Sequence, residues 1–196
     1  MKKSNIVIFL FLALNLFSEE SRLFEEPALF KIIKNNKSGF INQKGEIVIK
    51  PVFEEVYKFS EGLAGFGKLE VSETMGGRWK YGFIDSMGEV VIRADYDEIK
   101  DFKNGFARVR IDKKWGYVSP SNELKIGAFY DDSWDFYQGA ALVFQNGKFG
   151  YINSKGNNIT EIIYNGGGRF SNGRAKVKSD KKWGYIDKIG NIVIEP

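Results

Sequence analysis

The sequence contains no cysteine and no histidine, and it has only 4 prolines among its 196 residues. Without cysteine the chain offers no disulfide, thiol nucleophile or thiolate metal ligand. Without histidine it lacks the residue most often used as a general base and as a zinc ligand. These absences argue against zinc chemistry and nucleophilic catalysis, and we expect no metal and no cofactor.

The sequence is instead rich in aromatic residues, at 15%, and in glycine, with 22 residues. This composition is typical of strands and tight turns, and it favours an all-β fold. The length suits either one domain with a substantial core or one short array of repeats.

The N-terminus has the pattern of a signal peptide. Lys2 and Lys3 precede an uncharged, mostly apolar run over residues 6–17, and Ser18 is followed by two glutamates. A run of about a dozen apolar residues is too short to span a bilayer comfortably. We therefore predict a signal peptide over residues 1–18, with retention as an anchor as the alternative. After cleavage the protein would have no membrane span and would be exported, that is periplasmic, cell-surface or secreted.

The charge balance gives no support to nucleic-acid binding. The formal net charge is +4, from 29 basic and 25 acidic residues. The predicted signal peptide contributes two lysines and no acid, which leaves 27 basic residues against 25 acidic ones. We expect no nucleic-acid partner, because a nearly balanced, exported protein lacks the excess of basic charge that such binding uses.

A five-residue motif, best preserved as Lys182–Ile186 (KWGYI), recurs along the chain. Its central glycines are spaced by 43, 34, 34 and 34 residues: Gly39, Gly82, Gly116, Gly150 and Gly184. A Phe-x-x-Gly element repeats in step with the motif, beginning at Phe59, Phe102, Phe136 and Phe170. The first interval therefore carries a nine-residue insertion, which we place at residues 70–78. Such a strict period indicates a tandem array of five units.

Each unit reads as a three-stranded meander followed by a linking segment. In the third unit, Ala107, Val109 and Ile111 alternate with charged residues, which indicates a strand. A polar turn, the motif strand and a third short strand follow, the last clearest at residues 192–194. The linking segment carries an aromatic residue and an acid, as at 130–131, and has room for a fourth short strand.

The turn after the motif strand has a recognisable chemistry. Its first residue is Asp or Asn and its fourth is Gly, as in Asp187 and Gly190. The first side chain accepts backbone hydrogen bonds, and the glycine tolerates a positive φ. Ser119 and Asn122 take these two positions in the third unit. We therefore interpret these acids as turn residues rather than catalytic ones.

The motif itself is interpreted as the core of the repeat. Residues two apart in a strand share a face, so Trp183 and Tyr185 point one way and Gly184 the other. The aromatic face is either a core between units or an exposed ladder for a glycan or peptide. We favour the core, because one unit cannot bury its hydrophobic face alone. The predicted core residues are Trp115, Gly116, Tyr117, Phe149, Gly150, Tyr151, Trp183, Gly184 and Tyr185.

Glycine in the middle of a strand costs about 0.5–1 kcal/mol relative to alanine, so its recurrence needs a physical reason. The reason we expect is a neighbouring group that lies close over the bare backbone. The candidate for that group is the aromatic ring of the Phe-x-x-Gly element.

Carboxylate pairs occur in the linking segments, and Asp131 and Asp132 lie close to Trp134 in the sequence. A glycosidase needs two acids that face each other across a cleft. The pairs instead recur at one repeat position, which favours a structural role, so we expect no enzyme.

We place ligand binding where the repeat is interrupted, because insertions in repeat proteins often carry recognition. The interruptions are the insertion, followed by Trp79, and the segment 130–137 (YDDSWDFY). The alternative is that both are loops without a role. The candidate ligand-binding residues are Trp79, Asp131, Asp132 and Trp134.

The motif, its Asp-x-x-Gly turn, the Ile-Val-Ile-x-Pro strand end and the Phe-x-x-Gly-x-Ala strand start together resemble the WG (or KWG) repeat family. The resemblance covers residues 30–196 and is most specific around Trp115 and Trp183. It implies an exported or envelope-associated bacterial repeat protein, a class whose biochemistry is usually unassigned.

These patterns predict an all-β tandem array of five β-meander units of about 34 residues each. An open, curved array is favoured over a closed five-bladed, propeller-like ring, because propeller blades usually have four strands and about 40 residues. The units follow the signal peptide at approximately residues 19–50, 51–93, 94–127, 128–161 and 162–196.

The predicted function is that of an exported, non-catalytic binding or scaffold protein of the bacterial envelope. Its repeat surface would contact an envelope protein or a glycan. Two alternatives stay open: a carbohydrate-active or wall-modifying protein that uses Asp131 and Asp132, and a purely structural envelope component.

Overall fold

The computed structural model describes residues 28–72 and 76–196, and these residues form strands and turns without any helix. The strands make five small antiparallel sheets, one for each repeat unit, which confirms the predicted all-β array. No helix in this part of the chain is long and apolar enough to cross a membrane. The predicted signal peptide lies outside the described residues.

Each sheet consists of strands that follow one another in the chain. The first contains β1 (Phe30–Lys34), β2 (Lys37–Ile41) and β3 (Ile47–Phe53). The second contains β4 (Glu55–Ser60), β5 (Leu63–Ser72), β6 (Gly76–Ile84) and β7 (Val90–Tyr96). The third contains β8 (Glu98–Ile99), β9 (Ala107–Ile111), β10 (Lys114–Val118) and β11 (Leu124–Tyr130). The fourth contains β12 (Asp132–Ser133), β13 (Ala140–Gln145) and β14 (Lys148–Asn153), and the fifth β15 (Gly166–Gly167), β16 (Arg174–Ser179), β17 (Lys182–Asp187) and β18 (Ile192–Ile194).

The linking segment belongs to the sheet that follows it. Its short strand β8, for example, pairs with β9, where Ile99 lies opposite Val109. The strands β4, β12 and β15 pair in the same way with β5, β13 and β16. Each of the last four sheets therefore begins four residues after the unit boundary drawn from the sequence.

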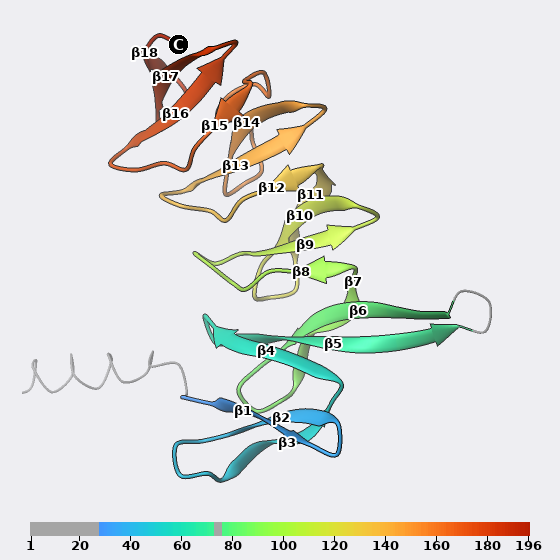
Figure 1. Ribbon diagram of the computed structural model, residues 1–196. Helices are drawn as coiled ribbons and strands as arrows, with labels where there is room; N and C mark the ends of the chain where they lie inside the picture. Colours follow the sequence, from blue (N-terminus) through green and yellow to red (C-terminus); the bar gives the residue numbers. More distant parts are fainter. Residues whose placement is uncertain (1–27, 73–75) are drawn as a thin grey trace, which may run out of the picture.

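The sheets are stacked in a column, with β1 at one end and β18 at the other (Figure 1). The first and last sheets lie far apart, so the described residues form an open array and no closed ring. The nine-residue insertion lengthens β5 and β6 into a hairpin arm that protrudes from the column (Figure 1). The pairing of the two strands continues along the arm as far as Ser72 and Gly76.

Aromatic side chains fill the gaps between successive sheets. In each gap the second aromatic residue of the motif meets the phenylalanine of the next unit's Phe-x-x-Gly element. The motif residue of each pair is at most 1% exposed, so these contacts form the core of the column. The pairs, with the distances between ring centroids, are Phe40–Phe59 (4.9 Å), Phe83–Phe102 (4.8 Å), Tyr117–Phe136 (4.8 Å) and Tyr151–Phe170 (5.4 Å).

The motif glycines make room for the backbone of the third strand. The residues of β11 that pair with Trp115 and Tyr117 are four apart instead of two, so β11 carries two extra residues here. These residues fold over Gly116, where an added Cβ would lie 2.6 Å from the carbonyl oxygen of Ile126. A close approach was expected, but the prediction that a phenylalanine ring makes it was wrong. Equivalent backbone atoms cover Gly39, Gly82 and Gly184, whereas Gly150 is covered by the side chain and backbone of Ile162 and the carbonyl oxygen of Glu161.

The turn after the motif strand has the predicted chemistry. In the last unit the Asp187 carboxylate accepts hydrogen bonds from two backbone N–H groups, at 3.0 and 2.9 Å, and Gly190 has a φ of 90°. In the third unit the Ser119 hydroxyl accepts the equivalent bond, and Asn122 has a φ of 59°. These side chains therefore hold the turns, as expected from the sequence.

A second turn, which was not predicted, links the units along the column. Asn104 and Gly105 of the Phe-x-x-Gly element both have positive φ, at 53° and 80°, as a type I′ turn requires. Their backbone N–H groups donate to the carboxylate of Glu61 in the preceding unit, at 2.6 and 2.8 Å. The Asn104 side chain donates to the carbonyl oxygen of Phe136 in the following unit, at 2.8 Å. Three successive units are thereby tied together by hydrogen bonds.

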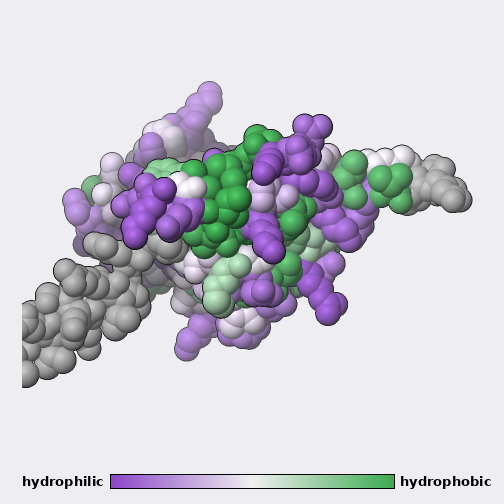
Figure 2. All heavy atoms as spheres, turned by 90° about the horizontal axis from the view of Figure 1, so that it is seen from below, coloured by the Kyte–Doolittle hydropathy of each residue, from purple (hydrophilic) through white to green (hydrophobic). Residues whose placement is uncertain are grey.

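Both ends of the column expose hydrophobic side chains. Figure 2 looks onto the end formed by the first sheet, where hydrophobic surface at the centre is surrounded by hydrophilic side chains. At the other end, Trp183 and Tyr185 are 47% and 43% exposed. These two residues were predicted in the repeat core and do not belong to it, because they lie on the end face of the column and no sheet among the described residues covers them.

Gly116→Ala is predicted to lower the free energy of unfolding by at least about 2 kcal/mol, because the added Cβ must displace the backbone of β11. Gly166→Ala is the matched control, since its added Cβ would lie 3.4 Å from the nearest side-chain atoms. The control should stay within about 0.5 kcal/mol of the wild type. Urea unfolding followed by tryptophan fluorescence measures both, and equal midpoints for the two variants would contradict the role given to Gly116.

Candidate functional site

The motif lysine forms an ion pair with the acid of the linking segment in the first three units. In two of these units the acid also caps the next hairpin turn; Asp131 accepts a hydrogen bond from the backbone N–H of Asn146 at 2.8 Å. Asp131 therefore joins two consecutive units. The ion pairs are Lys37–Glu54, Lys80–Asp97 and Lys114–Asp131.

Two of the pockets on the described part of the column lie at matching places, each between consecutive sheets. The Tyr57 pocket lies between the second and third sheets and has a volume of about 350 Å³. The Trp134 pocket lies between the fourth and fifth sheets and has a volume of about 400 Å³. Residues 99–101 line the first and residues 167–169 line the second, two repeat periods apart. The pockets are therefore equivalent positions of the array.

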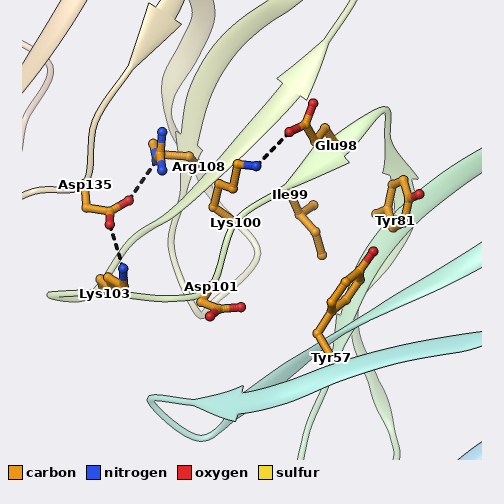
Figure 3. A pocket seen from close by; sticks show the side chains of 9 residues that line it. All are labelled: Tyr57, Tyr81, Glu98, Ile99, Lys100, Asp101, Lys103, Arg108 and Asp135. Atoms are coloured by element: carbon orange, nitrogen blue, oxygen red, sulfur yellow. Dashed lines mark hydrogen bonds and ion pairs between the residues drawn. The ribbon is translucent and has the colours of Figure 1, made fainter.

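The Tyr57 pocket has an aromatic wall and a charged wall (Figure 3). Tyr57 from β4 and Tyr81 from β6 stand on one side, with Ile99 from β8 beside them. Their ring centroids are 6.3 Å apart, with the planes tilted by 50°. Trp79 continues this surface outside the pocket, since it stacks on Tyr81 at 6.3 Å with an interplanar angle of 18°.

The charged wall of the Tyr57 pocket is a network of ion pairs. Asp135 accepts hydrogen bonds from Lys103 at 2.9 Å and from Arg108 at 2.8 Å. Glu98 accepts one from Lys100 at 2.8 Å. In all, three cationic and three anionic side chains line the pocket, so its charges balance. The wall offers fixed hydrogen-bond donors and acceptors next to an aromatic surface.

The Trp134 pocket is more apolar. Trp134 and Phe149 form its aromatic wall, with their ring centroids 5.9 Å apart. Arg169 lies at its edge, with its guanidinium 5.4 Å from the centroid of the Tyr137 ring. This pocket therefore combines exposed aromatic surface with a single guanidinium and the Asp135 carboxylate.

In the gap between the third and fourth sheets, cationic side chains occupy the position that is equivalent to the two pockets. The side chains of Lys100, Arg108 and Arg110 lie 5.6–5.7 Å from the centroid of the Trp115 ring. Trp115 is consequently buried, as predicted for a residue of the repeat core. The gaps along the column thus share the same arrangement of strands, and different side chains occupy them.

The candidate acids Asp131 and Asp132 line neither of these pockets. Asp132 is exposed and accepts a hydrogen bond from the backbone N–H of Ser133 at 2.7 Å. Of the two candidate tryptophans, Trp134 lines a pocket and Trp79 lies beside the other one. The structure therefore distributes the four candidate residues over separate places and does not bring them into one site.

The residues that give the Tyr57 pocket its chemistry, above all Tyr57 and Asp135, were not predicted from the sequence. A signal for Tyr57 exists in the register of the repeat. Successive units place a different kind of side chain at one repeat position, and its residues are Tyr57, Lys100, Trp134 and Gly168. Each of these four lines one of the two pockets.

Among residues 28–72 and 76–196, no group of three or more potential metal ligands is close enough to hold a metal ion. The lining of the two pockets consists of aromatic faces, hydrogen-bonding groups and paired charges.

The model of one protein family, described as WG containing repeat, matches five segments of the chain: residues 39–68, 81–115, 115–149, 149–183 and 183–196. All five matched segments begin at or next to a motif glycine, and together they cover more than half of the chain. No curated protein matches the chain.

Asp97→Asn is predicted to lower the free energy of unfolding at neutral pH. As the pH falls, the free energy of unfolding of this variant should decrease less steeply than that of the wild type. Burial alone would raise the pKa of Asp97, but hydrogen bonds from Lys80 and the Asp112 N–H, together with the charges of Lys80 and Arg78, lower it. A lowered folded pKa stabilises the protein above the unfolded value of about 3.9, and this stabilisation is lost as pH falls through the folded pKa. Asparagine keeps the cap on the turn, as Asn165 does for the Asp180 N–H.

Urea midpoints of wild type and Asp97→Asn between about pH 7 and pH 3 test this linkage. The difference between the two proteins should shrink towards the acid end. Asp95→Asn, an exposed acid two residues away, is the control. A difference that stays constant with pH, or an equal response in the control, would rule out the role given to the Asp97 charge.

Proposed function

The chain belongs to the WG repeat family, and on that premise we propose that it is an exported, non-catalytic binding or scaffold protein of the bacterial cell envelope. It contacts an envelope protein or glycan through the Tyr57 and Trp134 pockets. The observation that carries this proposal is that the two pockets recur at equivalent positions while their side chains differ.

The residues that assemble the column keep the same chemistry from unit to unit. The motif glycine, the Asp, Asn or Ser that begins the turn, and the phenylalanine of the next unit serve pairing and packing. The position shared by Tyr57, Lys100, Trp134 and Gly168 has no such common role, and it borders the pockets. Variation at pocket-lining positions on a repeated scaffold is typical of binding proteins.

A non-catalytic role agrees with the state of the carboxylates. Lys114 and the Asn146 N–H both bond Asp131, and they lower its pKa, so it is not suited to donate a proton. Asp135, which lines both pockets, accepts hydrogen bonds from two cationic side chains. A glycosidase requires one free carboxylate and one carboxylic acid on opposite sides of the substrate.

Export is supported by the pattern of residues 1–18. We predict that the full chain, made in a bacterial host with an affinity tag at its C-terminus, reaches the envelope or the medium and begins at Glu19. N-terminal sequencing of the fractionated protein tests this. Deletion of residues 2–18 should keep the protein in the cytoplasm. Recovery of the full chain from the cytoplasm with Met1 intact would overturn export.

Purified protein is predicted to release no product from cell-wall glycans or peptides. Asp132→Asn should match the wild type both in this respect and in the envelope material that it retains on an affinity column. Reducing-end and free-amine assays measure the release. Product formation by the wild type that Asp132→Asn abolishes would establish the carbohydrate-active alternative instead.

A further inference from the structure

The Tyr57 pocket has the chemistry of a site for one sugar ring. Its volume of about 350 Å³ is at the small end of the range for pockets that enclose organic ligands, about 300–1,000 Å³. Sugars present an apolar face of C–H groups and a rim of hydroxyl groups. The pocket has a matching division, with aromatic rings on one side and fixed polar groups on the other (Figure 3).

The aromatic wall is rigid. Gly65 backs the ring of Tyr57, since an added Cβ on this glycine would lie 3.0 Å from the ring. Gly67 in the same way lies beneath Trp79 and Tyr81, both at 3.1 Å. The rings therefore lie close against bare backbone, while Tyr57 keeps 37% of its surface exposed. A rigid, exposed ring face binds a flat apolar surface with little loss of conformational entropy.

The charged wall favours an uncharged ligand. Lys103 and Arg108 are both bound to Asp135, and Lys100 is bound to Glu98. An anionic ligand would have to compete with a carboxylate that already neutralises these cations. A hydroxyl group can instead donate to a carboxylate and accept from a cation at the same time, without breaking an ion pair. Neighbouring hydroxyl groups of a sugar meet that requirement.

The hydroxyl of Tyr57 is neutral and lies beside Glu55 and Tyr81. Burial, followed by the nearby Glu55 carboxylate, raises the pKa of Tyr57, so its hydroxyl keeps its proton in ordinary conditions. Outside the pocket, Trp79 extends the aromatic surface through its contact with Tyr81. A second sugar of the same chain would meet that ring.

We propose that the Tyr57 pocket binds one hexopyranose unit of an uncharged glycan, with the Tyr57 ring against the apolar face of the sugar and the Asp135 and Lys100 groups on its hydroxyls. Trp79 contacts the next unit of the glycan. This assignment rests on the proposed binding function and names the ligand class of one of its two pockets.

Calorimetric titration of the full chain with three uncharged hexasaccharides, namely cellohexaose, maltohexaose and chitohexaose in its N-acetylated form, tests the proposal. At least one should bind, and its affinity should be unchanged between about 0.05 and 0.5 M salt, because no net charge is neutralised. Tyr57→Ala should weaken binding by about tenfold or more, whereas Tyr57→Phe should retain it within about threefold.

Tyr185→Ala is the matched control, because Tyr185 is exposed to a similar extent in the last sheet. It should bind as the wild type does. Trp79→Ala should weaken binding of the hexasaccharide and leave binding of the corresponding monosaccharide unchanged. Circular dichroism of each variant verifies that the sheets are intact.

The proposal is overturned if none of the three sugars binds, or if Tyr57→Ala and Tyr185→Ala bind equally well. Preference for an anionic hexasaccharide of hyaluronan, with an affinity that falls as salt rises, would also overturn it. The broader function has a separate readout: envelope material retained equally by wild type and Tyr57→Ala would reject the sugar site and leave the binding function standing. Sensitivity of that material to protease would identify a protein partner.

Discussion

The carbonyl oxygen of Ile126 lies over the bare Cα of Gly116, and the path of the chain through the unit depends on this contact. Two extra residues in β11 fold across the motif strand at this point. Their fold brings Tyr130 opposite Trp115, so that Asp131 follows directly beside Lys114. A side chain on Gly116 would displace the two extra residues of β11. Asp131, the acid that joins the next unit, would move with them.

The same contact explains why the aromatic residues of the motif face the neighbouring unit. With one face of the strand occupied by the folded backbone, the rings on the other face are left to pack against the next sheet. Tyr117 meets Phe136 there, and its hydroxyl donates to the carbonyl oxygen of Trp134 at 2.8 Å. Packing and the satisfied hydroxyl together fix the distance between sheets, and the pockets lie at the margin of these gaps.

Sequence reasoning reached those features that depend on neighbours in the chain. The period, the strands and the Asp187-type turns follow from alternation and from residues within four positions of one another. The path of β11 over Gly116 could not be predicted, because two extra residues within one strand leave the spacing of the motifs unchanged. The Tyr57 pocket was out of reach for a different reason: Tyr57 and Asp135 come from units that are two periods apart. Only the side chains that differ at one repeat position hinted at Tyr57, and that position does not include Asp135.

Because the column is open and does not close on itself, its geometry does not fix the number of its units. A ring must change the angle between blades when a blade is added, whereas each sheet here meets only the sheets before and after it. Duplication of one 34-residue stretch would therefore insert a sheet between two surfaces that already fit it. Each such event would add one more lateral gap, so the valency of the column can evolve separately from the chemistry of any single pocket.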